Sequence, residues 1–432
     1  MVTCSKRPNV SELSTATNLP PSPQAPLASV KRVEQLASTL KIAQQKDRAG
    51  KWAISFAALL VLSGVAMILF FLVAESLPLI FEPEKHPGGT LEKMFLPQKY
   101  KGYAEPQYVW QTEASEGGEE KFGVPLLIWG TLKGAFWAMF FSAPLAIMTA
   151  LFVAEFAKSQ LRTVIKSAIE LLAGVPTVVI GFIAFVTLSP IFNDYFQSNT
   201  AYFRNGLWIG ILIQILVFTI VSAGLGARIL ISRRSAGVKA FGIAGVLMLG
   251  VLAGLLTGRV LDWTAAPLFR PLFGVTKYTQ LNGILAGFCL GFAIIPIIFS
   301  VAEDAMRAVP HSYREASLAL GASPWETALR VILPAALPGI YAALMLGLAR
   351  AVGETMIILM ASGNTPIFEV SPFTGMRTMS AAIAIEASEK ARFSTGYHVL
   401  FFVGTLLFFM TLVLNVATEQ VITRLKKRYH VG

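Results

Sequence analysis

The sequence predicts an all-α, polytopic membrane protein with about eight transmembrane helices. Of its 432 residues, 54% are hydrophobic and only 14% are charged, and the mean hydropathy of +0.62 is far above that of a soluble domain. The apolar residues gather in stretches of roughly 20, the length that an α-helix needs to cross a hydrocarbon core. The formal charge of +11 comes from Lys and Arg residues that lie mainly between these stretches, which favours a membrane protein over a nucleic-acid-binding domain.

The chain begins with a polar cytoplasmic leader, residues 1–51, which we expect to be partly disordered. Apolar residues recur at helical spacing over 30–46 and predict a short amphipathic helix on the membrane surface, although a solvated helix explains them equally well. Residues 52–123 are expected to form the first transmembrane helix and a long external loop. The loop is rich in glutamate and is either a docking surface or a solvated connection.

Residues 124–423 are expected to form the main transmembrane domain, followed by a basic cytoplasmic tail, 424–432. The eight expected spans are 52–73, 125–153, 167–188, 207–231, 238–257, 281–301, 337–361 and 399–422. Placing the amino terminus in the cytoplasm puts most Lys and Arg residues on that side, so both termini are expected to be cytoplasmic.

Residues 302–336, between the sixth and seventh expected spans, have helical periodicity but are too polar to cross a membrane. This stretch contains R-E-A-S-L-A-L-G at 314–321 and then S-P-W-E. Gly321 favours the turn that ends a helix, Ser323 suits the cap of a second helix, and Pro324 suits its first turn. The pattern predicts two short helices joined at Gly321.

Residues 302–336 resemble the loop by which ABC importer permeases bind their ATPase subunit, and we call them the docking segment. The residues expected to couple the two subunits are Glu315, Ala316, Gly321, Trp325, Leu333 and Pro334. Ser317 stands where the family pattern has alanine, and Val331 where it usually has isoleucine; both preserve size and helical tendency.

Four further stretches, 169–181, 300–310, 347–356 and 361–364, are similar to C-type permease subunits of phosphate-uptake ABC importers. The resemblance implies a type I importer permease fold, with 206–258 as an inserted helical hairpin. It also implies a homologous permease partner, an ATPase dimer that binds ATP and Mg, and an external phosphate-binding protein. No phosphate-binding G-x-x-x-x-G-K-[ST] sequence occurs in this chain, so ATP hydrolysis is expected on a separate chain.

Two ionisable residues, Arg350 and Glu354, lie four residues apart near the middle of an expected span, so we expect them on one helix face. A charged side chain there costs about 2.5–3.5 kcal/mol on insertion scales, so it needs a partner or a polar path. A guanidinium matches phosphate oxygens, and the carboxylate can hold it when the anion leaves. A structural ion pair between helices is the alternative. With the resemblance, Thr355 joins this expected substrate pathway.

The expected third span contains Gly174, Pro176 and Gly181, which loosen helical hydrogen bonding. The freed backbone can line a polar cavity, with Thr177 as a hydroxyl contact, or it can be a helix kink without function. Lys133 lies in the external third of its expected span, where its stem is long enough to reach the headgroups by snorkelling.

Other functions remain open. The same machinery can carry another oxyanion or a small solute, and an ion-gradient-driven secondary transporter or channel would need no ATPase. The two cysteines and four histidines have no metal-binding spacing, and no nucleophile, base and orienting group can be assembled in the spans. We therefore expect a transporter subunit and not an enzyme, with no cofactor on this chain.

Overall fold

The computed structural model describes residues 27–100, 105–112, 120–198 and 278–429. These residues are mainly helical, which confirms the all-α prediction. Six of their helical segments are long and apolar enough to cross a membrane: Lys46–Phe81, Val124–Glu155, Thr177–Asp194, Gly283–Arg307, Pro324–Gly353 and Thr395–Leu425. The expected spans 207–231 and 238–257, and the hairpin that contains them, lie outside the described residues.

The chain divides into two compact units, 1–71 with Gly432, and 72–431. The described part of the first unit belongs to α2 (Leu27–Ser76), which continues into the second unit. The expected amphipathic helix and the first span are therefore one continuous helix. Only isolated glycines interrupt this sequence, and each costs about 1 kcal/mol relative to alanine, which does not end a helix.

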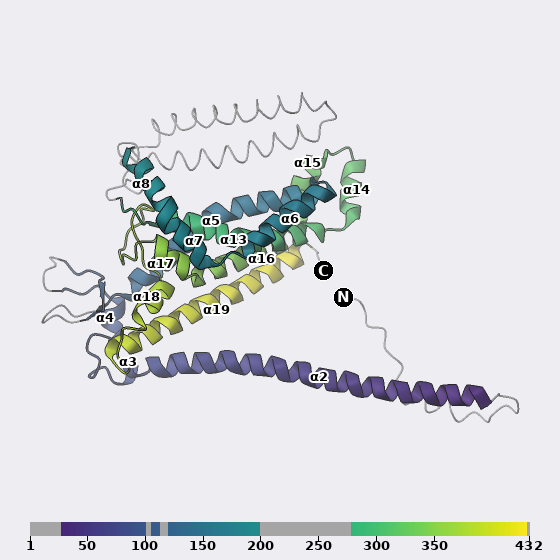
Figure 1. Ribbon diagram of the computed structural model, residues 1–432, viewed down its shortest axis with the longest axis horizontal. Helices are drawn as coiled ribbons and strands as arrows, with labels where there is room; N and C mark the ends of the chain where they lie inside the picture. Colours follow the sequence, from purple (N-terminus) through teal and green to yellow (C-terminus); the bar gives the residue numbers. More distant parts are fainter. Residues whose placement is uncertain (1–26, 101–104, 113–119, 199–277, 430–432) are drawn as a thin grey trace. The chain divides into compact units, whose positions relative to one another are not determined.

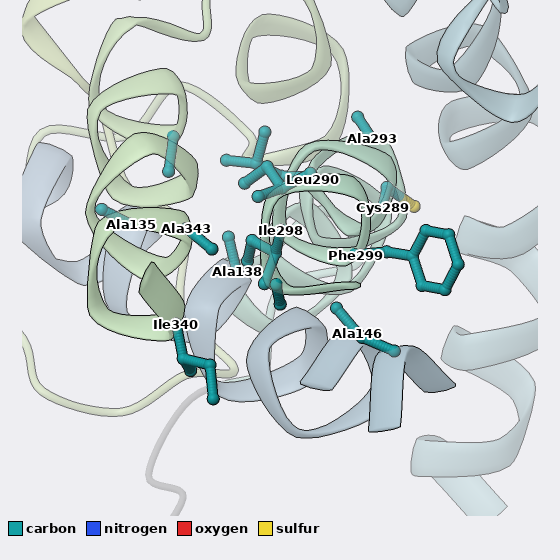
Figure 2. Packing of buried hydrophobic residues seen from close by; sticks show 14 of the residues in the cluster. Ala135, Ala138, Ala146, Cys289, Leu290, Ala293, Ile298, Phe299, Ile340 and Ala343 are labelled. Atoms are coloured by element: carbon teal, nitrogen blue, oxygen red, sulfur yellow. The ribbon is translucent and has the colours of Figure 1, made fainter. Parts of the chain in front are cut away.

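Four long helices form the centre of the second unit: α5 (Val124–Glu155), α13 (Gly283–Arg307), α16 (Leu333–Gly353) and α19 (Thr395–Tyr429). Helix α13 packs against α5 and α16, and α16 packs against α19 (Figure 1). Small side chains such as Ala138, Ala146 and Ala343 lie between the larger Leu290, Ile298 and Ile340 in the core (Figure 2). Small residues let membrane helices approach closely, which increases their packing contacts.

The expected third span is not one helix. Helix α6 (Ser159–Ala173) ends at Gly174, and α7 (Thr177–Ile183) begins after Pro176; a π-helical turn and α8 (Ser189–Ser198) follow. Proline lacks an N–H and holds the residue before it away from helical geometry, so the helix ends there. Helix α6 has no buried side chain, and the apolar candidate span begins only at Thr177.

The expected seventh span is also interrupted. Helix α16 ends at Gly353, Glu354 has extended backbone geometry, and α17 (Met356–Ala361) follows. A second short helix, α18 (Met379–Glu386), precedes α19.

The described part of the long loop expected on the external side, residues 77–100, 105–112 and 120–123, is folded. It contains α3 (Pro78–Phe81), α4 (Leu91–Phe95) and a two-stranded antiparallel sheet, β1 (Trp110–Gln111) and β2 (Lys121–Phe122). Its buried apolar residues form one cluster with residues of α5, α18 and α19. Trp110 Nε1 donates to Glu386 Oε1 at 2.9 Å, and Arg377 pairs with the same carboxylate at 2.6 Å. Packing on the helices, rather than local propensity, therefore orders this loop.

The acidic side chains Glu82, Glu84, Glu92 and Glu105 are exposed on this folded loop. Their solvent contact agrees with the solvated-loop interpretation. Docking of a partner at this loop remains a prediction.

A histidine pair fastens the same loop to the start of α19. His86 Nδ1 lies 3.1 Å from Thr395 Oγ1, and its ring meets the His398 ring edge-on at a centroid distance of 5.0 Å. His398 Nδ1 donates to the Glu75 carbonyl at 2.7 Å. Burial lowers the pKa of His86 below its ordinary value, and the neighbouring His398 adds to this effect.

Candidate functional site

The docking segment forms the two short helices that its sequence predicts. Helix α14 (His311–Ala319) ends before Gly321, which has a φ of +85°. Ser323 then caps α15 (Pro324–Thr327): its hydroxyl accepts from the Glu326 N–H, and the Glu326 carboxylate accepts from the Ser323 N–H at 2.9 Å. Glycine adopts positive φ without the strain that a Cβ would add, and the reciprocal cap satisfies two free N–H groups.

An ion pair fixes α14 to the end of α5. Arg314 Nη2 lies 2.7 Å from Glu155 Oε1, and Arg314 Nε donates to Oε2 at 3.1 Å. Other guanidinium hydrogens are donated to the carbonyls of Met306 and Val309 at the end of α13. One arginine thus joins the docking segment to two long helices.

Ser317, the residue that departs from the family's alanine, is buried between the two short helices. Its hydroxyl lies 2.9 Å from Thr327 Oγ1. The substitution therefore adds a hydrogen bond that links α14 to α15. The Trp325 ring also contacts the Phe156 ring at a centroid distance of 5.9 Å.

Large apolar side chains of the docking segment remain exposed in this chain: Tyr313 is 53% exposed, Leu318 48% and Leu320 89%. Glu315, Ala316 and Gly321 lie on the same exposed segment, whereas Trp325 is half-buried. Leu333 and Pro334 are also half-buried and begin α16. The expected coupling residues therefore divide into an exposed group and a group that connects it to the transmembrane helices.

A second ion-pair cluster lies at the carboxy-terminal end of α13. Glu303 is fully buried and accepts from Arg307 at 3.2 Å and from Lys166 of α6 at 3.4 Å. The two cations compensate the buried carboxylate, since an isolated one would be costly. Glu170 is exposed on α6.

The two interrupted spans lie side by side. Helix α7 packs against α17, and a Cβ at Gly181 would lie 3.2 Å from the Met356 carbonyl oxygen and 3.0 Å from the Met360 sulfur. Glycine thus allows close approach of two short helices that each follow a break in a span. The tertiary structure brings Pro176 and Thr177 into the same region as the segment after Glu354.

Arg350 and Glu354 do not share a helix face, so that part of the prediction is wrong. Helix α16 ends between them, and Glu354 has ψ of 130°. Arg350 is exposed, while Glu354 is 9% exposed. No ion pair between described residues joins the two. The alternative, a structural ion pair between helices, stays a prediction. Thr355 is half-buried after the break, and Thr177 half-buried beside exposed Pro176.

Sequence reasoning missed the contacts that two polar side chains make. Ser380 Oγ of α18 donates to the Glu354 carbonyl at 2.9 Å. Lys133 is 5% exposed and donates to oxygens of the connection between α17 and α18, so the snorkelling interpretation is wrong. Every residue type carries a main-chain carbonyl, so the sequence does not show which residue accepts such a hydrogen bond. Neither contact could therefore be predicted from the sequence.

The fold and these features are those of a multi-pass membrane protein that exposes the docking segment. Residues 142–431 match the family described as "Binding-protein-dependent transport system inner membrane component". The chain belongs to this family and is an ABC transporter permease. Its place is therefore the inner membrane, as a component of a transporter that uses a binding protein.

Several relatives are similar over most of their length. The phosphate transport system permease protein PstC of Haemophilus influenzae is 28% identical over 72% of this chain and 78% of the relative. The probable ABC transporter permease protein YqgH of Bacillus subtilis is 26% identical over 71% of this chain and 74% of the relative. The phosphate transport system permease protein PstC 1 of Mycobacterium tuberculosis is 28% identical over 71% of this chain and 74% of the relative.

Proposed function

We propose that this chain is a permease subunit of an ATP-driven importer that moves inorganic phosphate across the bacterial cytoplasmic membrane. The observation that carries the importer role is the docking segment, whose exposed Tyr313, Leu318 and Leu320 are mounted on α5 by the Arg314–Glu155 ion pair. The names of the PstC relatives support phosphate as the substrate.

The docking segment is the coupling element of this proposal. A separate ATPase dimer binds ATP and Mg and covers the exposed apolar side chains of α14. When the ATPase closes, Arg314 transmits the movement to the ends of α5 and α13, because it bonds to both. Because Arg314 fixes the docking segment to these helices, the docking segment and the helices move together as a packed unit, and the movement is not absorbed by a flexible loop.

The substrate pathway lies along the interrupted spans in this proposal. Arg350 is exposed although it belongs to an apolar span, and a charge at that depth faces protein or water rather than lipid. A homologous permease subunit covers this face, and phosphate passes between the two chains. Glu354 and Thr355 after one break, and Pro176 and Thr177 at the other, line the same path with irregular backbone.

The external phosphate-binding protein delivers the anion on the side of the folded 77–123 loop. Both termini lie in the cytoplasm, as the basic tail favours, and lipid surrounds the remaining apolar helix surfaces. No cofactor is assigned to this chain.

Phosphate uptake by the reconstituted complex tests the function. Uptake into vesicles is expected to require ATP inside, the ATPase and the binding protein.

Arg350→Gln is expected to reduce uptake at least tenfold with normal assembly, whereas Arg392→Gln, a change at an exposed arginine outside the spans, leaves uptake unchanged. Parental uptake by Arg350→Gln would refute the pathway role, and uptake without the ATPase would favour a secondary transporter. Competition by sulfate or molybdate but not phosphate would indicate another oxyanion.

A further inference from the structure

The connection between α17 and α18, residues 362–378, is irregular but closely held; we call it the linker. It contains two residues with positive φ, Gly363 and Asn364, and its ends meet where the Met376 N–H donates to the Ser362 carbonyl at 3.1 Å. Because the linker forms no helix, its carbonyls need donors from elsewhere.

Two side chains one turn apart on α5 supply such donors. Trp129 Nε1 donates to the Glu369 carbonyl at 3.1 Å. Lys133 Nζ donates to the same carbonyl at 3.2 Å, to the Thr374 carbonyl at 3.4 Å and to Thr374 Oγ1 at 3.0 Å. Residues four apart share a helix face, so α5 presents both donors to the linker.

The number of acceptors requires the charged form of Lys133. Its amino group has three acceptors, and only the ammonium has three hydrogens to donate. The side chain is 5% exposed, and the Glu369 carboxylate interacts with it electrostatically. A buried ammonium is costly unless it is fully hydrogen-bonded, so this lysine gains its stabilisation only when the linker is in place.

The linker in turn controls the position of both interrupted helices. Its amino-terminal end continues from α17, which packs against α7, and its carboxy-terminal end leads to α18, whose Ser380 bonds to the Glu354 carbonyl. The first N–H groups of α13 also donate to the linker: Gly283 to Thr374 and Ile284 to Pro372. The linker therefore connects α5 and α13 with the region of the proposed pathway.

We propose that Lys133 is a positioning residue for transport: its ammonium holds the linker on α5 and thereby fixes the two breaks that line the pathway. This inference rests on the proposed function for its transport readout. Lys133 makes no contact with substrate, and its effect comes through the linker. Loss of the ammonium leaves the Glu369 carbonyl with Trp129 as its donor and the Thr374 carbonyl with the Gly283 N–H. With these fewer bonds to α5, the linker then opens to solvent.

Accessibility of Ser371, a linker residue that is 5% exposed, tests the position of the linker directly. Ser371→Cys would be placed in a Cys4→Ser background and labelled with a hydrophilic maleimide in nanodiscs; the remaining Cys289 is 2% exposed. Lys133→Met is expected to increase the labelling rate at least fivefold, while Lys133→Arg, which retains donors, restores slow labelling. Lys99→Met, at an exposed lysine, serves as the control and is expected to leave labelling slow.

Transport gives the second readout. Lys133→Met is expected to lower the maximal rate of phosphate uptake at least tenfold. The phosphate concentration for half-maximal uptake is expected to stay unchanged, because the binding protein sets it. Lys133→Arg is expected to recover most of the maximal rate. Slow labelling in Lys133→Met, or equal defects in the Met and Arg variants, would overturn the proposal. If Lys133→Met fails to assemble, Thr374→Val removes one acceptor and is expected to double the labelling rate; unchanged labelling would again overturn it. If the parental complex does not transport phosphate but labelling responds as expected, only the proposed substrate fails.

Discussion

Neutralising Glu155 is expected to destabilise the docking segment by a measurable amount. The carboxylate is 11% exposed and the Arg314 side chain is 15% exposed, with the closest N–O distance at 2.7 Å. Removing one partner of a buried pair costs about 3–5 kcal/mol, because the other charge is left uncompensated. Here some solvent contact remains, and Arg314 keeps the Met306 and Val309 carbonyls as acceptors. We therefore expect Glu155→Gln to cost about 2 kcal/mol.

A double-mutant cycle isolates this interaction from other effects of the substitutions. Glu155→Gln, Arg314→Gln and the double variant would be compared by equilibrium unfolding in mixed detergent micelles, with Glu170→Gln, at an exposed position on α6, as the control. The expected coupling energy is about 2 kcal/mol, and the control is expected to stay within about 0.5 kcal/mol of the parent. Single-variant costs that add to within about 0.5 kcal/mol would refute the reasoning. In the transporter, Glu155→Gln is expected to lower ATP-driven uptake, measured with the amount of co-purified ATPase held equal.

Three further outcomes are expected. Gly287→Ala is expected to destabilise the bundle by about 1–3 kcal/mol in the same unfolding assay, because its Cβ would overlap the Cβ of Trp137; parental stability would contradict the α5–α13 packing. Gly321→Ala is expected to reduce ATPase co-purification, because the φ of +85° strains a residue with a Cβ by about 1 kcal/mol, and unchanged co-purification would show that the turn is not needed. Acidification is expected to weaken the histidine pair. The pKa of His86 is lower in the folded protein than in the unfolded chain, where it is near 6.5. The neutral His86 ring therefore stabilises the fold above the unfolded pKa, and this stabilisation is lost as the pH falls through the folded pKa. Limited proteolysis of the 77–123 loop at pH 5.0 and 7.5 measures this, and His86→Gln should remove the pH dependence; equal cleavage at both pH values would contradict it.

The docking segment is the part that sequence predicted in most detail. The turn at Gly321 and the cap at Ser323 depend on residues within four positions of each other, so local chemistry specifies them. The same reasoning failed at Glu354, where a regular helix was expected through an apolar stretch. At this break the Glu354 carbonyl accepts a hydrogen bond from Ser380, 26 residues further along the chain. Local periodicity cannot predict so distant a partner.

Among the expected residues of the substrate pathway, some features could be predicted from local sequence and others could not. Pro176 predicted a break because proline removes a backbone donor wherever it stands in a helix. That this break lies beside α17 depends on packing at Gly181 against Met356 and Met360, which involves residues far apart in the chain. Lys133 shows the same limit, since its acceptors lie more than 230 positions away.

The sequence by itself determined that this protein is a helical membrane protein whose docking segment forms two short capped helices, because hydrophobic length, charge distribution and short-range caps are properties of consecutive residues. The permease family came from the resemblance of particular motifs. The tertiary structure alone decided which breaks meet, which charges are paired and how the loop after the first span folds. Those features depend on contacts between segments that are far apart in the chain. Such contacts are made by close packing and by main-chain carbonyls, which every residue type carries, so the sequence does not show which segments meet.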